Sequence, residues 1–160
     1  ASALKHTRRT GVMVTDQFGT LSLNTIKADR LLVPTNKGLG AAPAGPPAPG
    51  AADHYKCYTV SRTLNTPRFP VGVQATVADQ FENRLYNIKK PHRLCVPVDK
   101  NAEGIENPAA NLLCYTASRA IGQPRHVKQG GLYTDNQLGI GRLNTVKEDE
   151  LCVPAHVTLP

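Results

Sequence analysis

The sequence predicts an all-β protein made of tandem Ig-like or β-sandwich units, built from three copies of one repeat of about 57 residues. Two observations carry this prediction. A triplet and a tetrad recur three times with fifteen residues between their first positions, and the segments around them alternate apolar and polar residues. The triplets are Asp16-Gln17-Phe18, Asp79-Gln80-Phe81 and Asn136-Gln137-Leu138, and the tetrads are Leu31-Leu32-Val33-Pro34, Leu94-Cys95-Val96-Pro97 and Leu151-Cys152-Val153-Pro154.

A complete copy is expected to contain four strands in a fixed order. The first carries a Cys-Tyr pair and is absent from copy one, and the second is a half-buried strand that alternates up to the triplet. A short third strand and the tetrad follow, and the tetrad's proline must lie at a strand end or an edge because it has no N–H to donate. The first strand is expected at Tyr55–Val60 and Leu112–Ala117, and the third at Leu21–Ile26, Leu85–Ile88 and Leu143–Val146.

The alternation also predicts which side chains form the core. Residues that share the inward face of a strand are two apart, so their immediate neighbours should be exposed. The exposed neighbours are expected to be Met13, Gln74 and Thr76. The predicted core consists of Val12, Val14, Phe18, Leu31, Val77, Phe81, Leu94, Leu132, Leu138 and Leu151.

The four cysteines follow the repeat. Four cysteines allow three connectivities, but Cys57 to Cys95 and Cys114 to Cys152 are both 38 residues, and copy one lacks both members of such a pair. Pairing within each copy explains that joint absence. Each bridge would contribute roughly 4 kcal/mol in the chain-entropy model. Disulfides persist in oxidising compartments, so we expect a secreted, extracellular protein.

Composition shifts divide the chain into an incomplete first repeat (1–37), a Pro/Gly/Ala linker (38–52), a second repeat (53–100) and a third repeat (101–160). Repeats two and three are expected to pack together. Below about 40 residues a domain needs disulfides, metals or oligomerisation. Because repeat one has 37 residues and no cysteine, we expect it to borrow structure from elsewhere.

Several functional classes are disfavoured by the composition. The net charge is +7, yet Lys and Arg are dispersed without the basic–aromatic pattern of a nucleic-acid-binding surface. The sequence contains no run of eighteen apolar residues, so it predicts no membrane span. The five histidines are scattered, and no nucleophile motif, phosphate loop or metal-ligand spacing occurs. We therefore expect no enzyme activity, no metal and no cofactor.

Two polar positions are identical in all three copies. They are Gln17, Gln80 and Gln137, and Asn24, Asn87 and Asn144. They could form a repeated ligand-binding pair, but the structural alternative is favoured, in which their amides satisfy backbone groups at turns and strand ends. Lys27, Lys90 and Lys147 are also identical and are expected to be solvated charges.

The chain resembles an uncharacterised repeat family of secreted proteins from environmental bacteria. The resemblance rests on the order of four motifs, which are Cys57-Tyr58, Asp79-Gln80-Phe81, Leu94-Cys95-Val96-Pro97 and Cys114-Tyr115. The resemblance implies no activity. A strand-deficient Ig-like unit is also similar in architecture to pilus subunits that assemble by donor-strand exchange, and that likeness rests on fold alone.

These features lead to a hypothesis and its rival. In the hypothesis the protein is the structural subunit of an extracellular pilus-like fibre, a head-to-tail homopolymer in which a neighbour's strand completes repeat one. The donor would be the segment 1–10, with Ala1, Ala3 and Leu4 as its apolar residues. In the rival, a monomeric secreted module binds a surface or polysaccharide, with acidic polysaccharide or a cell surface as partner, and repeat one folds back onto the other two.

Overall fold

The structure is a computed structural model that describes residues 5–160. All of its regular elements are β-strands, as the alternation predicts. No helix in the described part of the chain is long and apolar enough to cross a membrane. The strands are β1 (Val12–Asp16), β2 (Gly19–Leu32), β3 (Asn36–Gly38), β4 (His54–Arg62), β5 (Gln74–Ala78), β6 (Asn83–Val98), β7 (Asn111–Arg119), β8 (Leu132–Asn136), β9 (Gly139–Leu143) and β10 (Glu150–Thr158).

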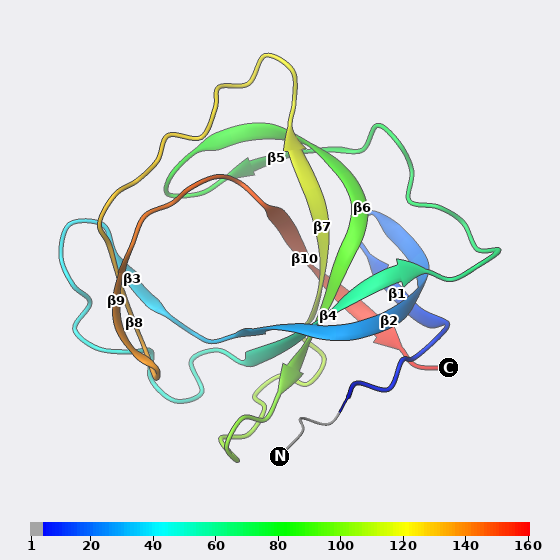
Figure 1. Cartoon of the computed structure of the whole chain (residues 1–160), viewed down its shortest axis with the longest axis horizontal. Coiled ribbons are helices and arrows are strands. Elements are labelled where there is room, and N and C mark those ends of the chain that lie inside the picture. The colour runs from blue at the N-terminus through cyan, green and yellow to red at the C-terminus, as the bar shows by residue number, and fades with distance from the viewer. Residues whose placement is uncertain (1–4) are drawn as a thin grey trace.

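Seven strands form one antiparallel sheet in the order β4-β2-β1-β10-β7-β6-β5. Because β4 also pairs with β6, six of these strands close into a ring. The seventh strand, β5, pairs with the start of β6. The remaining strands form a separate sheet in the order β3-β8-β9, which lies at the left of Figure 1.

The ring crosses the repeat boundaries in an equivalent way each time. Leu32 of repeat one lies opposite Tyr55 of repeat two, and Cys95 of repeat two lies opposite Leu112 of repeat three. These pairs occupy the same positions of the repeat. The tandem Ig-like units expected from the sequence are therefore not what the structure shows, because all three repeats contribute strands to one sheet.

Strands β1 and β2 of repeat one both pair with strands of the same chain. Strand β1 pairs with β10 of repeat three, and β2 pairs with β4 of repeat two. The proposed donor residues Ala1, Ala3 and Leu4 lie outside the described residues. Further along this segment, His6 bonds to Thr25 of β2, with 2.9 Å between Nε2 and Oγ1, and stacks on Tyr58 of β4.

Both predicted disulfides are confirmed. Cys57–Cys95 joins β4 to β6, and Cys114–Cys152 joins β7 to β10. In each pair the two cysteines are direct partners in the sheet register. The bridges lie side by side, with 3.9 Å between the sulfurs of Cys95 and Cys114. Each bridge thus connects the first and last strands of its own repeat.

The core prediction holds for most positions. The side chains of Val12, Val14, Leu94 and Leu132 are buried, and Met13 is exposed, as expected. The expected exposure of Gln74 and Thr76 is also seen. The other predicted core residues that are at least half-buried are Phe18, Val77, Phe81 and Leu151.

Two core predictions are wrong. Leu31 is 51% exposed and Leu138 is 77% exposed. Leu31 lies in the half of β2 that, within residues 5–160, pairs with a strand on one side only. Leu138 is at the tip of the β8–β9 hairpin, which belongs to the separate three-stranded sheet and not to the ring.

The third expected strand is shortened in repeat three. There β9 ends at Leu143, and the following residues up to Asp149 form no strand, whereas β6 of repeat two runs without interruption through both expected strands. Figure 1 shows this irregular segment leading from β9 into β10. The segment supplies part of the pocket described below.

Candidate functional site

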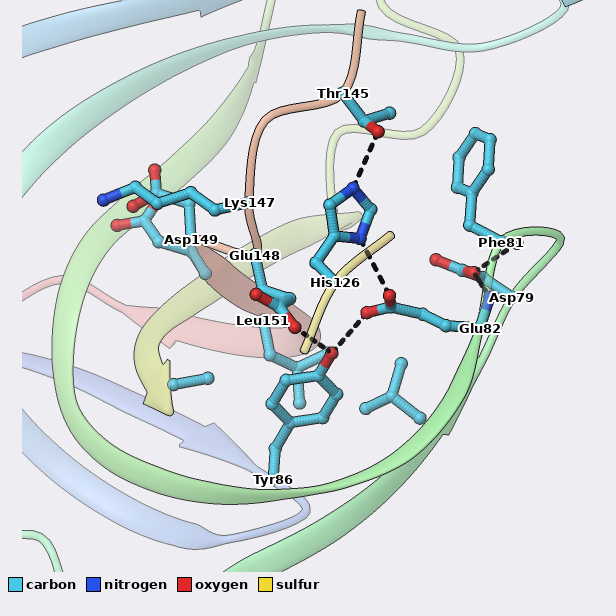
Figure 2. A pocket seen from close by; sticks show the side chains of 13 residues that line it. Asp79, Phe81, Glu82, Tyr86, His126, Thr145, Lys147, Glu148, Asp149 and Leu151 are labelled. Carbon is cyan, nitrogen blue, oxygen red and sulfur yellow. Dashed lines mark hydrogen bonds and ion pairs between the residues drawn. The ribbon is translucent and has the colours of Figure 1, made fainter. Parts of the chain in front are cut away.

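A pocket of about 230 Å³ lies where repeats two and three meet. Its walls come from the turn before β6, from β6 itself, from the loop between β7 and β8, and from the irregular segment before β10. Figure 2 shows Glu82, Tyr86, His126 and Glu148 pointing toward one another at its base.

The polar base of the pocket is specific to repeat two. Repeat one has the pattern Gly19, Leu21, Leu23 where repeat two has Glu82, Arg84 and Tyr86. The two leucines are buried in the core of the ring, and Arg84 and Tyr86 are also buried. Repeat two therefore places a cation and a phenol at positions that are apolar in repeat one, and such groups must find polar partners.

Arg84 finds these partners on both sides of the repeat boundary. One of its guanidinium nitrogens donates to Oε1 of Glu148 at 2.8 Å, and the other donates to the carbonyl of Arg125 at 2.8 Å and lies 3.1 Å from Oε2 of Glu82. The side chain is 5% exposed. Arg84 thus holds repeat-three segments against β6, because a buried guanidinium is tolerated only when its donors are satisfied.

A chain of hydrogen bonds crosses the pocket base. The hydroxyl of Tyr86 donates to Glu82 at 2.5 Å, Nδ1 of His126 lies 2.8 Å from the other Glu82 oxygen, and Nε2 of His126 lies 2.7 Å from the hydroxyl of Thr145. Burial raises the pKa of the Glu82 carboxyl, but the bonds from Tyr86 and His126 outweigh it and leave that pKa below its ordinary value. Burial, together with the bond to Glu82, raises the pKa of the Tyr86 phenol.

The His126–Thr145 contact is a recurrent part of the repeat. In repeat one His6 makes the same contact with Thr25, and in both cases the threonine hydroxyl also accepts a backbone N–H, from Arg9 or from Gln129. Repeat one makes this contact although it has Gly19 in place of the acidic partner Glu82. The role of the histidine–threonine contact is therefore structural. What repeat two adds is Glu82, which replaces Gly19 at the end of the turn.

Glu82, His126 and Glu148 have ligand atoms within 4.8 Å of one another, which is a spacing that could hold a metal ion. Arg84, however, already contacts both carboxylates. A divalent cation would have to share these oxygens with a buried guanidinium, and the Coulomb repulsion would be strong at such short range. The cluster is better described as an internally neutralised ion-pair network than as a metal centre.

A second network lies beside the pocket and joins all three repeats. The aligned runs Asp29-Arg30, His92-Arg93 and Asp149-Glu150 come together. Arg93 donates to Asp29 and to Glu150, and Arg30 lies 3.6 Å from both Asp149 and Glu150. The hydrogen bond from Arg93 lowers the pKa of Asp29. Equivalent positions meet because the three repeats are arranged around one ring.

A single family model spans all three repeats. A model described as a repeat of unknown function (DUF7450) matches residues 2–154. The chain belongs to the DUF7450 repeat family. No curated protein and no solved structure matches it. The expectation of an uncharacterised repeat family is thereby confirmed.

Two of the three asparagines retained in this DUF7450 chain accept hydrogen bonds from backbone N–H groups. The side-chain oxygen of Asn24 accepts from the N–H of Gly11 at 3.0 Å, and that of Asn144 accepts from the N–H of Gly131 at 2.7 Å. In repeat two the oxygen of Asn87 accepts from the Gln74 side chain at 2.8 Å. The three glutamines, Gln17, Gln80 and Gln137, are exposed at the turns and are not brought together.

The pocket residues of the DUF7450 chain were not expected from the sequence. A signal was available in the repeat alignment, where Arg84 and Tyr86 replace leucines that repeat one places in a predicted strand. The acidic run at 148–150 was visible as well. Its partner could not be found without the fold, because Arg84 and Glu148 are 64 residues apart.

Proposed function

We propose that the protein is a secreted binding module that recognises a polysaccharide through the pocket between repeats two and three. The observation that supports this proposal most is the pocket itself, in which hydrogen-bonding groups from two repeats surround a hollow of about 230 Å³. The two disulfides, which are typical of oxidising compartments, support a location outside the cell.

The folding of repeat one supports a monomeric module. Its strands β1 and β2 pair inside the chain, with β10 and with β4, which is the arrangement that the rival hypothesis requires. The strands of repeat one then serve to close the ring and do not depend on a neighbour for most of their hydrogen bonds.

The protonation state of the pocket supports binding over acid catalysis. A catalytic acid that works near neutral pH needs a raised carboxyl pKa. The pKa of Glu82 is lowered, and its two oxygens are engaged by Tyr86, His126 and Arg84. Glu82 is therefore an ionised, positioned acceptor.

The acceptor groups of the pocket favour one kind of saccharide. Five carboxylates line the pocket, and although Arg84, Arg30 and Arg93 pair with four of them, their remaining lone pairs can accept hydrogen bonds from a ligand. The carboxylates are those of Asp79, Glu82, Glu148, Asp149 and Glu150. An amino sugar, with hydroxyl donors and an ammonium group, suits such a pocket, whereas an acidic polysaccharide would meet the basic surface outside it.

Co-sedimentation with insoluble polysaccharides tests this proposal. The wild-type chain should bind chitosan, an amino-sugar polymer, more strongly than cellulose or a cross-linked polyuronate. The double variant Glu148→Gln/Asp149→Asn should lose at least tenfold in affinity, while Glu106→Gln, a carboxamide change outside the pocket, should leave binding unchanged. Equal binding by both variants, or a preference for the polyuronate, would contradict the proposed pocket.

A second candidate function is the pilus-like fibre. It is favoured by one observation, which is that the second half of β2 pairs with a strand on one side only in the part of the chain that the structure describes. A strand from another subunit could extend the sheet there. Negative-stain microscopy of the concentrated protein would show filaments in this case and single particles in the case of a monomeric module.

A further inference from the structure

We infer that the two disulfides form one unit for thiol–disulfide exchange. Cys152 is the site at which an external dithiol attacks, and Cys114 then passes the exchange on to Cys57–Cys95. The product is a new bridge between Cys95 and Cys114, with free thiols at Cys57 and Cys152. The inference does not rest on polysaccharide binding, because none of the four cysteines lines the pocket.

The two bridges lie on one face of the sheet and meet at Cys95 and Cys114. Cys95 lies opposite Leu112 of β7, and Cys114 follows Leu112 by two residues, so the cysteine side chains point to the same face. Their sulfurs, which belong to different bridges, are 3.9 Å apart. Since bonded sulfurs are about 2 Å apart, an approach of about 2 Å is enough to join them.

One of the four cysteines is far more accessible to a thiol from solution than the others. Cys57, Cys95 and Cys114 are each 1% exposed, and two further apolar side chains pack against them. Cys152, at the start of β10, is exposed. Because exchange requires a thiolate to reach a disulfide sulfur, attack begins at Cys152.

The first exchange opens the bridge between Cys114 and Cys152. A thiolate of the dithiol attacks Sγ of Cys152, the bond between the two protein sulfurs breaks, and Cys114 leaves as a thiolate. The second thiol of the reagent then attacks the mixed disulfide, which releases Cys152. Two electrons have passed from the reagent to the bridge, and the reagent leaves as a cyclic disulfide.

The second exchange moves the opening to the other bridge. The Cys114 thiolate attacks Sγ of Cys95, so that the bond between these sulfurs forms and Cys57 leaves as a thiolate. The two protons that the reagent has lost end on Cys57 and Cys152, and no further electrons are needed. The new bridge joins β6 to β7, whereas β4 and β10 lose their covalent bonds to neighbouring strands.

Repeat one determines where the exchange ends. Leu32 is equivalent to Cys95, and it lies opposite Tyr55, two residues before Cys57. Cys57 thus has Leu32 at the place where Cys114 has a cysteine neighbour. A leucine offers no sulfur to the Cys57 thiolate, so the exchange stops there.

Two single variants that lose the same bridge test the inference. In Cys152→Ala the free thiol is Cys114, which lies against Cys95, so it should exchange with Cys57–Cys95 without any reagent. In Cys114→Ala the free thiol is Cys152, and Cys57–Cys95 should stay intact. After incubation in a mildly alkaline buffer, free thiols are trapped with excess maleimide in a weakly acidic denaturant. The label at Cys57 should be at least ten times higher in Cys152→Ala.

Peptide mapping locates the label, because a lysine or arginine separates each pair of successive cysteines and trypsin therefore places them on different peptides. Both variants lack the same disulfide, so a general loosening of the fold would label Cys57 equally in the two. Equal label at Cys57, or label confined to Cys114 in one variant and to Cys152 in the other, would overturn the inference.

The wild-type chain gives a measurement that does not depend on the folding of these variants. Limited reduction of the folded protein with dithiothreitol should give, as the main early product, label at Cys57 and Cys152 together with linked Cys95 and Cys114. The same reaction in denaturant is the control, in which this preference should disappear because the bridges are no longer held side by side. Label at Cys114 and Cys152, with Cys57–Cys95 intact, would show that the two bridges are reduced independently and would contradict the proposed exchange.

Discussion

Arg84 is the residue on which the junction of repeats two and three depends most. It is buried and joins Glu82, Glu148 and the backbone of Arg125, so three segments of the chain share one cation. Two carboxylates are left without this partner when the guanidinium is removed. The effect of a substitution should therefore exceed that of an ordinary surface charge.

Substitution of Arg84 by methionine should lower the free energy of unfolding by about 3–5 kcal/mol, as expected for breaking a buried ion pair. Urea denaturation at pH 7 measures this loss. Arg125→Ala removes the same charge from an exposed side chain and keeps the carbonyl that Arg84 uses, so it should cost less than about 0.5 kcal/mol. Equal losses in the two variants would show that Arg84 does not carry the junction.

Glu82 should make stability depend on pH. Its folded-state pKa lies below the ordinary value of 4.5, so ionised Glu82 stabilises the fold above pH 4.5, and this contribution is lost as the pH falls through the folded-state pKa. Glu82→Gln should be less stable than wild type at pH 7 and should lose less stability between pH 5 and pH 3. Parallel pH profiles for the two proteins would contradict this assignment.

The role of a single residue can be predicted from the sequence where all the repeats share that residue. It cannot be predicted where one repeat has a different residue from the others. Asn24 and Asn144 recur with their backbone partners, so the structural interpretation of the amides could be made in advance. Glu82 replaces a glycine in one copy only, and its partners are distant in the chain. Nothing local indicates that such a residue is part of a pocket.

Among the elements, the four strands connected by disulfides form the most strongly fixed part of the ring. Cys57–Cys95 and Cys114–Cys152 each join the first and last strands of a repeat, with equal sequence separations of 38. In the chain-entropy model equal loops give equal stabilisation. A difference between the bridges must then come from packing, because Cys57, Cys95 and Cys114 are buried and Cys152 is exposed.

The loss of stability on removing each disulfide should reflect this difference in burial. The variants Cys57→Ala/Cys95→Ala and Cys114→Ala/Cys152→Ala should each lose about 2–5 kcal/mol. The first should lose more, because it removes two buried sulfurs from the core and leaves a larger cavity. Thermal unfolding followed by circular dichroism gives the order, and a greater loss in the Cys114/Cys152 variant would contradict the packing argument.

Most strands were predictable, although the expected strand Leu143–Val146 is not formed beyond Leu143, and their assembly was not predictable. Alternation around Val12 and Val14 gives β1, and the Cys-Tyr segments give β4 and β7. Which strands become neighbours depends on pairings between distant segments, such as Val14 with Val157. Periodicity describes one strand at a time, so it could not distinguish separate sandwiches from one ring shared by three repeats.

For the whole molecule, the defining feature is that repeat one closes the ring of its own chain. The ring order follows from β1 lying between β2 and β10. If β1 paired with another subunit, the same contacts would exist between chains, and the protein would assemble.

A designed disulfide between β1 and β10 shows whether the ring closes within one chain. Thr15 and His156 are register partners, and both are exposed, so cysteines at these positions should form a bridge without disturbing the core. After mild oxidation of Thr15→Cys/His156→Cys, non-reducing electrophoresis should show a single band of a monomer of 17.2 kDa, with the new bridge confirmed by peptide mapping. A ladder of chains in which position 15 of one copy is linked to position 156 of the next would contradict the closed ring.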